Sequence, residues 1–295
     1  MKKILVLGGT RYFGQKVVQE FITAGHDVTV ATRGQRTDPF ENHVTRVVID
    51  RHDGEHPSWP ILGAQQWDIV FDNICFTEND ANIALTYLKE VKHYLVTSSL
   101  AVYEGESTST GFKEADFAPS SYRYTPSPEV SYGEGKRQVE TYFTHRATFP
   151  VTYLRFPVVL DDDDYTERLH YYIRKVLQGE SITFRRSEGL FGFIRASEIP
   201  QAITFVIANN VFGPLNIASD APFTTERFLA TLANTTGKEP LLRIGSEDIS
   251  PFSHYDSVLD LSRLSEVGYP VTSLASWLPD LMKRLTVQEQ QNVTK

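Results

Sequence analysis

Residues 4–14 read ILVLGGTRYFG, an apolar run that ends in a glycine-rich turn followed by a helical pattern. A buried strand that enters a helix through such a turn is typical of phosphate-binding sites, because the N–H groups at the helix start point at anionic oxygens. Gly8 allows a sharp turn of the backbone, and Gly14 allows the helix, expected to start near Phe13, to approach the sheet. Arg11 stands at the central position, where the usual fingerprint has glycine. The motif is therefore a variant dinucleotide fingerprint, and by itself an ordinary strand-to-helix turn explains it equally well.

The residues after this turn complete a β-α-β unit. Apolar residues recur at helical spacing from Val17 to Ile22, Gly25 stands where a helix-ending glycine belongs, and Val28 to Ala31 read as a second strand. Strand and helix patterns then alternate, with strands expected at 44–49, 67–74, 94–98 and 151–156 and helices at 82–91, 132–146 and 168–177. Such alternation predicts an α/β fold of the Rossmann type with a doubly wound parallel sheet.

The pattern loosens after Pro157, which predicts a second, smaller domain of α+β character. We expect an NAD(P)-binding Rossmann domain over 1–157 plus about 191–218, and a substrate-binding domain over about 158–190 and 219–295. The run Asp161 to Asp164 is interpreted as a solvated acidic turn rather than a metal site, so no metal is expected.

The composition fits an enzyme of a reducing compartment. The 295-residue chain has a formal net charge of −8, which argues against a nucleic-acid partner. No apolar stretch reaches the roughly 20 residues of a membrane span, and the apolar residues before Gly8 are too few for a signal peptide. The single cysteine, Cys75, cannot form an internal disulfide and is expected to be a buried packing residue. We therefore expect a cytoplasmic protein with a small-molecule substrate and with no membrane or nucleic-acid partner.

The candidate catalytic residues are Ser99, Tyr132 and Lys136. The Tyr-x-x-x-Lys spacing puts both side chains on one face of a helix, so that the ammonium can lie near the phenol. The spacing occurs three times in the chain, but only Tyr132 opens a helix after the fifth strand and its loop, where a parallel sheet presents its ligand-binding edge. Ser99 ends that fifth strand, and the alternative for its hydroxyl is a hydrogen bond within the turn.

Together these residues resemble the extended branch of the short-chain dehydrogenase/reductase superfamily, which contains the sugar-nucleotide epimerases and dehydratases. The resemblance covers nearly the whole chain and is carried by the stretches at 8–14, 98–103, 132–136, 154–157, 193–199, 215–219, 260–264 and 268–270. The Gly-Gly-Thr-Arg opening is similar to an atypical, epimerase-like subgroup that includes the chloroplast stem-loop-binding proteins. Relatives often pair through two helices of the sheet layer, so the resemblance also implies a homodimer.

The resemblance implies a role for each residue of the catalytic set. Tyr132 would exchange a proton with a substrate hydroxyl or carbonyl, and Ser99 would hydrogen-bond the reacting oxygen. Lys136 would hold the cofactor ribose and lower the pKa of the tyrosine, while hydride passes to or from the nicotinamide. A phenol needs its pKa lowered by roughly 3 units, which is about 4 kcal/mol, to act near neutrality.

The predicted cofactor is NADP(H) in preference to NAD(H). NAD-dependent relatives end the second strand with an acidic residue, whereas here Thr32 stands at that position and Arg33 follows. Arg33, Arg11 and Arg36 could clamp a 2′-phosphate, and the alternative is that Arg33 and Arg36 are solvated loop residues. The resemblance further implies adenine contacts from the surface loop after the third strand and a nicotinamide contact from the proline after the Leu-Arg strand. The predicted cofactor-binding set is Gly8, Thr10, Arg11, Tyr12, Phe13, Gly14, Thr32, Arg33, Asp50, Arg51 and Pro157.

The substrate is expected to be a weakly charged carbonyl or alcohol rather than a typical nucleotide sugar. Sugar-nucleotide relatives carry a diphosphate-binding arginine where this chain has Phe191, and the stretch expected to hold a second arginine, 249–255, offers only His254. Asp161 to Asp164 would repel a diphosphate, and Phe191, Phe193 and Phe252 suit an apolar substrate. The alternatives are an NAD-dependent nucleotide-sugar epimerase or dehydratase and, in another class, a non-catalytic cofactor-sensing or RNA-binding protein on the same fold.

Overall fold

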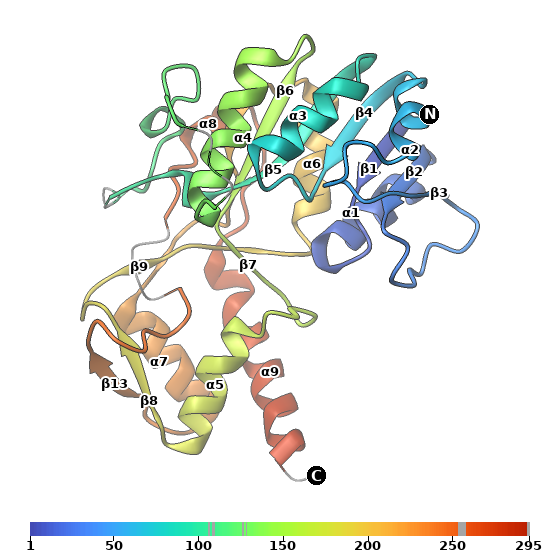
Figure 1. Cartoon of the computed structure of the whole chain (residues 1–295). Helices are drawn as coiled ribbons and strands as arrows, with labels where there is room; N and C mark the ends of the chain where they lie inside the picture. The colour runs from blue at the N-terminus through green and yellow to red at the C-terminus, as the bar shows by residue number, and fades with distance from the viewer. Residues whose placement is uncertain (106, 108–109, 126, 128, 253–257, 294–295) are drawn as a thin grey trace. The chain divides into compact units, whose positions relative to one another are not determined.

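The computed structural model describes residues 1–105, 107, 110–125, 127, 129–252 and 258–293. Its largest element is a seven-stranded sheet with the order β11-β6-β5-β4-β1-β2-β3, in which every pairing is parallel (Figure 1). The strands are β1 (Lys3–Leu7), β2 (Asp27–Thr32), β3 (Thr45–Val48), β4 (Trp67–Asp72), β5 (Val91–Ser99), β6 (Val151–Phe156) and β11 (Gly213–Asn216). The strand order reverses between β1 and β4, as in a doubly wound Rossmann-type sheet, so the predicted fold class is confirmed.

The chain divides into two compact units. Unit 1 comprises 1–104, 113–156 and 197–216 and holds this sheet, and unit 2 comprises 105–112, 157–196 and 217–295. Compared with the predicted division, 105–112, 157, 191–196 and 217–218 belong to unit 2. One reason is that 193–195 pair with 158–160 in a small separate sheet. The binding roles of the two units remain predictions.

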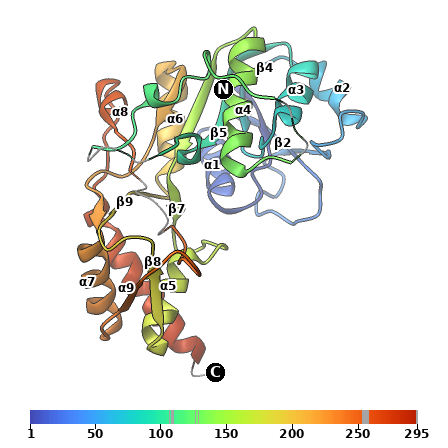
Figure 2. The ribbon, with the colours of Figure 1, turned by 60° about the vertical axis from the view of Figure 1, so that its left-hand side comes forward.

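Helices flank the sheet of unit 1 (Figure 2). Helix α1 (Tyr12–Thr23) packs beside α6 (Ile199–Asn209), and α3 (Glu78–Tyr87) packs beside α2 (Ser58–Gly63) and α4 (Tyr132–Arg146). Two 3-10 turns, η1 (Leu100–Val102) and η2 (Glu114–Asp116), follow β5. The predicted bounds of α4 and β6 are confirmed, whereas α2 was not predicted. The helix predicted at 82–91 lies instead at 78–87, because Thr77 and Asp80 form a capping box at its start.

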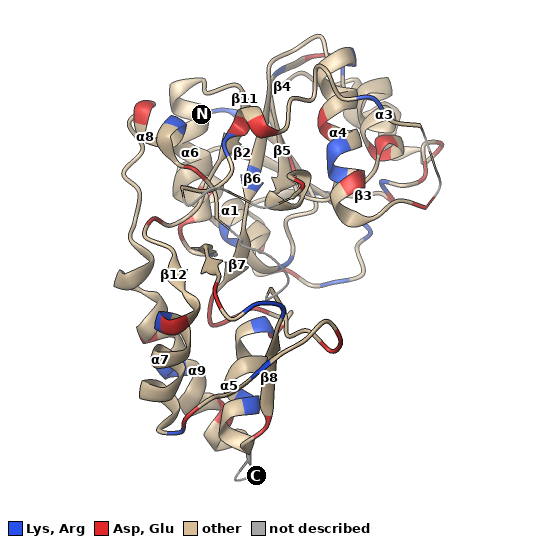
Figure 3. Ribbon diagram, turned by 90° about the vertical axis from the view of Figure 1, so that its left-hand side faces the viewer, with Lys and Arg blue, Asp and Glu red and all other residues tan. Residues whose placement is uncertain are grey.

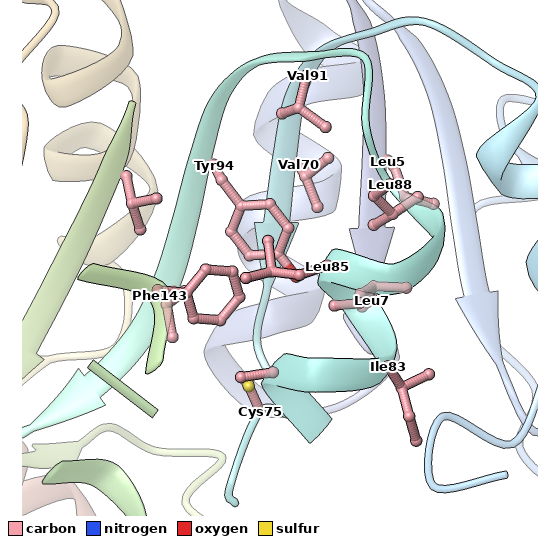
Figure 4. Close-up of a cluster of buried hydrophobic side chains, with 14 of the residues drawn as sticks. Leu5, Leu7, Val70, Cys75, Ile83, Leu85, Leu88, Val91, Tyr94 and Phe143 are labelled. Atoms are coloured by element: carbon pink, nitrogen blue, oxygen red, sulfur yellow. The ribbon is translucent and has the colours of Figure 1, made fainter. Parts of the chain in front are cut away.

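The core of unit 1 contains residues from the sheet and from α3 and α4. Figure 4 shows Phe143 of α4 and Leu85 of α3 beside the Tyr94 ring, and the ring centroids of Tyr94 and Phe143 are 4.8 Å apart. Cys75 is fully buried in the same cluster, as predicted. Each large apolar side chain buried here contributes about 1.5–3 kcal/mol relative to its exposed state, so this cluster fixes the two helices against the sheet.

Unit 2 contains two-stranded sheets and helices around its own core. The sheets pair β7 (Val158–Leu160) with β10 (Phe193–Arg195), β8 (Ser181–Phe184) with β13 (Leu241–Ile244), and β9 (Leu190–Phe191) with β12 (Phe223–Thr224). The helices are α5 (Arg168–Gln178), α7 (Thr225–Thr236), α8 (Ser262–Glu266) and α9 (Leu278–Val293), with a 3-10 turn η3 (Leu274–Ser276). None of the helices in the described ranges combines the length and apolar character needed to cross a bilayer.

A buried histidine in β5 makes the stability of unit 1 depend on pH. His93 is 3% exposed, its Nε2 lies 2.7 Å from Thr152 Oγ1, and burial lowers its pKa from 6.5 to about 4. Between these pH values the unfolded chain binds a proton that the folded chain does not, so stability is complete above pH 6.5 and falls as the pH falls toward 4. We expect a loss of about 2 kcal/mol between pH 7 and pH 5 from this group.

Urea denaturation of wild type and His93→Gln at both pH values checks this expectation. The glutamine variant cannot titrate, so the free energy of unfolding should fall less for it than for wild type between pH 7 and pH 5. Equal losses in the two proteins would show that His93 does not cause the acid sensitivity.

Candidate active site

The glycine-rich turn after β1 has the backbone that the sequence predicts. Gly8 has φ +93° and donates its N–H to the Ala31 carbonyl at 3.0 Å, so the sharp turn is confirmed. A Cβ on Gly14 would lie 2.6 Å from Asn73 Nδ2 and 3.1 Å from the Gly9 Cα, so the close approach of the helix is confirmed as well. Gly9 was not given a role from the sequence. It has φ +84°, and a Cβ there would lie 2.7 Å from Val6 Cγ1, so no other residue fits.

The other residues predicted around this turn lie at or near the start of α1. Arg11 is the N-cap residue and is exposed, and Thr10, Tyr12 and Phe13 are partly exposed. The rings of Phe13 and Phe156 meet edge to face with centroids 5.9 Å apart, which links α1 to the end of β6. The turn therefore stands at the carboxyl end of β1, where ligands of doubly wound sheets bind.

The segment after β2 carries the residues predicted to select NADP(H). Thr32 accepts a hydrogen bond from the Gly34 N–H at 3.3 Å, and Arg33 and Arg36 are exposed. Within the described residues neither guanidinium forms a hydrogen bond or an ion pair. Both are therefore available to an anionic ligand or to solvent.

Arg51 is not the surface residue that the sequence suggested. It is 2% exposed, and its guanidinium donates to both carboxylate oxygens of Asp72 at 2.8 Å and to the Asp80 carbonyl at 2.8 Å. Removal of one partner from such a buried Arg-carboxylate pair strongly destabilises a protein, so the Arg51 side chain has a structural role. The guanidinium of Arg51 is therefore not on the surface, and the adenine contacts predicted for Arg51 and for the partly exposed Asp50 remain predictions.

Lys136 is the most informative residue of the candidate site. Its side chain is 1% exposed, and Nζ donates to the carbonyls of Cys75 and Thr97, each at 2.7 Å. These two carbonyls lie near the carboxyl ends of β4 and β5, which places the ammonium at that edge of the sheet. Burial lowers the pKa of Lys136 to about 8, so the side chain remains a cation at neutral pH.

Tyr132 lies one helical turn before Lys136 on α4 and is 54% exposed. The Lys136 ammonium is 5.7 Å from the centre of the Tyr132 ring and 4.6 Å from that of Phe76. Phe76, which follows β4, is 41% exposed and its ring centroid is 6.5 Å from that of Tyr132. The fold therefore brings the predicted tyrosine and lysine together and adds an exposed aromatic residue that sequence reasoning missed.

Two further glycines let α4 reach the sheet edge. A Cβ on Gly133 would lie 2.4 Å from the Ala101 carbonyl oxygen, and one on Gly135 would lie 2.4 Å from the Phe76 carbonyl oxygen. Glycine lowers the stability of a helix interior. Two glycines within one helical turn were therefore a sequence signal that neighbouring backbone approaches the helix closely. Figure 3 shows both basic and acidic segments on the α4 ribbon, and the sequence of this helix places Lys136 and Arg137 after Glu134.

Ser99 ends β5 and caps the short turn η1. Its Oγ accepts a hydrogen bond from the Ala101 N–H at 3.1 Å, so the turn-capping alternative is realised. The residue is partly exposed, and its hydroxyl proton is still able to donate to a ligand oxygen. The neighbouring Ser98 instead donates to the buried Glu140, which binds Arg155 at 2.6 Å.

The unit 2 residues that entered the substrate prediction have structural roles. Phe191 and Phe193 are buried in the core of unit 2 with their rings parallel, so they do not line a substrate site and that prediction is wrong. The acidic turn is not simply solvated either, because Asp162 binds Arg284 at 2.8 Å and Asp161 binds Arg195 at 3.1 Å. No metal-binding group of side chains occurs in the described ranges, and His254 lies outside them. Pro157 is buried at the start of the second segment of unit 2, and its cofactor contact remains a prediction.

The chain has the fold of UDP-glucose 4-epimerases, which agrees with the fold that the resemblance to the extended short-chain dehydrogenases/reductases implied. A UDP-glucose 4-epimerase from Thermotoga maritima, solved with UDP-glucose, is similar over 99% of this chain and 100% of its own, with TM-score 0.71 and 21% identity. A UDP-glucose 4-epimerase from Thermus thermophilus, solved with NAD, is similar over 97% and 98% of the two chains, with TM-score 0.68 and 16% identity.

Two curated proteins are similar to this chain in sequence. A 2′-dehydrokanamycin reductase from Streptomyces kanamyceticus is 30% identical over 138 residues, which are 47% of this chain and 36% of the relative. A chloroplast stem-loop binding protein of 41 kDa from Arabidopsis thaliana is 29% identical over 115 residues, which are 35% of this chain and 30% of the relative. The chain thus spans about a third of each curated relative that it matches, and no family model matches it.

Proposed function

We propose that the protein is an NAD(P)-dependent oxidoreductase of the extended short-chain dehydrogenase/reductase type, which transfers hydride to or from a carbonyl or alcohol. The position of Lys136 carries this proposal, because its buried ammonium lies at the carboxyl ends of β4 and β5 and beside the Tyr132 ring. The glycine-rich turn belongs to the same unit. The name of the Streptomyces relative, a reductase, supports the same reaction class.

The residues present fit a nicotinamide dinucleotide. Gly9 and Gly14 leave no room for a Cβ beside Val6 and Asn73, so the start of α1 packs closely on the sheet, which is the helix–strand packing that dinucleotide-binding turns require. When bound, the cofactor supplies the ring that accepts or donates hydride. Tyr132 would then give or take a proton at its phenol oxygen, Lys136 would stabilise the phenolate and hold the ribose, and Ser99 would donate to the reacting oxygen.

We propose NADP(H) as the preferred cofactor, although the Thermus epimerase was solved with NAD. The support is the lack of a carboxylate at Thr32 and the exposed guanidinium groups of Arg33 and Arg36, which have no partner among the described residues. Each charge-assisted hydrogen bond to a 2′-phosphate contributes roughly 1.5–3 kcal/mol.

Replacing Arg33 tests this preference. In Arg33→Ala we expect the Kd of NADPH to rise by about 10-fold or more, with the Kd of NADH unchanged, because only NADPH carries the 2′-phosphate. Fluorescence titration with both nucleotides measures the two constants. Arg46→Ala is the matched control, since it removes the same charge from exposed β3, where Arg46 binds Asp38 at 2.6 Å. Equal or tighter binding of NADH by the wild type would overturn the assignment.

An epimerase or dehydratase acting on a nucleotide sugar is the second candidate, favoured by the ligand in the Thermotoga structure. Against it, Phe191 occupies the position of the expected diphosphate-binding arginine and is buried in the core of unit 2. Asp161 pairs with Arg195 and Asp162 with Arg284, so these carboxylates repel a diphosphate less than the sequence suggested. Calorimetry with UDP-glucose at saturating cofactor distinguishes the oxidoreductase from the epimerase or dehydratase. Binding of UDP-glucose with a micromolar Kd would favour the epimerase.

RNA binding is the candidate from another class, favoured by the name of the Arabidopsis relative. The net charge of −8 opposes it, since nucleic-acid affinity comes mainly from basic side chains on phosphates. We retain a cytoplasmic location, a homodimer and a small-molecule substrate as proposals that rest on composition and on the family resemblance.

A further inference from the structure

The Asp80 carboxylate binds the Cys75–Phe76 peptide group, whose carbonyl oxygen accepts a hydrogen bond from Lys136. Asp80 is fully buried in the first turn of α3. Its Oδ2 accepts the N–H of Phe76 at 2.8 Å and the N–H of Thr77 at 3.0 Å. Its Oδ1 lies 2.7 Å from His52 Nδ1 and 3.6 Å from Arg51 Nε. A helix-capping box requires only the bond to Thr77, so the remaining contacts of Asp80 call for another explanation.

The Cys75–Phe76 peptide group connects Asp80 to the candidate site. Its N–H donates to Asp80, and its carbonyl oxygen accepts from Lys136 Nζ at 2.7 Å. A trans peptide is planar and its N–H and C=O point in opposite directions, so a carboxylate on one side orients and polarises the oxygen on the other. The next carbonyl, that of Phe76, lies against Gly135, where a Cβ would come within 2.4 Å. The segment 75–77 is thus fixed from both sides.

We propose that Asp80 is a positioning residue for the reaction, which holds the Cys75–Phe76 peptide group and through it the Lys136 ammonium beside Tyr132. This role rests on the function proposed for Tyr132 and Lys136. The negative charge of Asp80 also offsets part of the free-energy cost of burying the ammonium. A neutral peptide group alone offsets less of that cost.

Other charged and titratable groups surround the Lys136 ammonium, so a substitution at Asp80 has to be chosen with these groups in view. The Cys75 thiol and the buried Asp72–Arg51 pair lie on the β4 side, and the Tyr132 phenol lies on α4. Asp80 itself faces Arg51 and His52. Asp80→Asn changes none of these residues and keeps an amide oxygen that can accept from the Phe76 N–H, while its NH2 group replaces the carboxylate oxygen that faces Arg51 and His52.

The experiment follows the Lys136 Cε resonance in protein labelled with ¹³C-lysine, assigned by its absence in Lys136→Met and titrated without cofactor or substrate. We expect the pKa of Lys136, about 8 in the wild type, to fall in Asp80→Asn, because a negative charge that favours the ammonium is removed. Asp80→Ala should in addition weaken NADP(H) binding, because it also releases the peptide group.

Thr77→Ala is the matched control. Thr77 Oγ1 accepts from the Asp80 N–H at 3.3 Å, so this variant breaks the same capping box but leaves the Asp80 carboxylate on the peptide group. Its Lys136 titration should equal that of the wild type. An unchanged titration in Asp80→Asn, or an equal shift in Thr77→Ala, overturns the role of Asp80. Failure of the wild type to bind NADP(H) would instead overturn the proposed function, and the titration would still report on the Asp80 contact.

Discussion

Tyr132→Phe is expected to lower turnover by about 100-fold to 10,000-fold while leaving NADP(H) binding intact, because a positioned proton donor contributes this much to a rate. The ring of Tyr132 is 54% exposed, and the change removes only the hydroxyl, so the fold and the contact with Phe76 should remain. The measurement is the rate of change of nicotinamide absorbance on a substrate found by screening carbonyl compounds and alcohols, with cofactor affinity determined separately by titration.

Tyr142→Phe is the control for this variant. It removes a hydroxyl from the same helix, where Tyr142 donates to Asn82 Oδ1 at 2.6 Å on the α3 side of the unit, and turnover should not change. A Tyr132→Phe protein with full activity on the true substrate would remove the acid/base mechanism, whatever its cofactor affinity.

Lys136→Met is expected to impair both cofactor binding and turnover, with turnover lower by up to about 1,000-fold near neutral pH. The upper limit follows from the roughly 3 units by which the phenol pKa must be lowered, a shift expected to come from the Lys136 ammonium together with the positive charge of the oxidised nicotinamide. Methionine has a similar length and places no charge in the interior, so the variant should fold. Stopped-flow turnover and NADPH titration at pH 7 give the two effects separately.

The chain contains its own control for Lys136. Tyr171 and Lys175 have the same spacing on α5, and the Lys175 ammonium is 5.7 Å from the Tyr171 ring, the same distance as in the candidate pair. Lys175 instead pairs with Glu180 on the surface of unit 2. Lys175→Met should therefore leave cofactor affinity and turnover unchanged. If both lysine variants lost activity equally, the effect would come from global destabilisation and not from the site.

Much of the fold was predictable because its signals are local. The apolar run that ends at Gly8 predicted β1, the glycine turn and α1, and the predicted bounds of α4 and β6 match those of the structure, in which Ser131 caps α4. The prediction missed the start of α3, because Thr77 is followed by Asp80 where the capping box is more often completed by glutamate or glutamine. Helix α2, only six residues long, has too little periodicity to be recognised.

The sequence by itself predicted the chemistry of the candidate site, and the tertiary structure decided which of the predicted residues lie together. Residue types and spacing selected Gly8, Gly14, Tyr132 and Lys136, because backbone freedom and helical periodicity are properties of short segments. Burial and pairing between distant residues are not properties of short segments: Asp72 and Asp80 bind the buried guanidinium of Arg51, and Phe191 lies in the core of unit 2. The carbonyls of Cys75 and Thr97, 61 and 39 residues from Lys136, distinguish its tyrosine-lysine pair from the identical pair on α5. Those contacts form only when β4, β5 and α4 pack together, so no local sequence pattern could have predicted them.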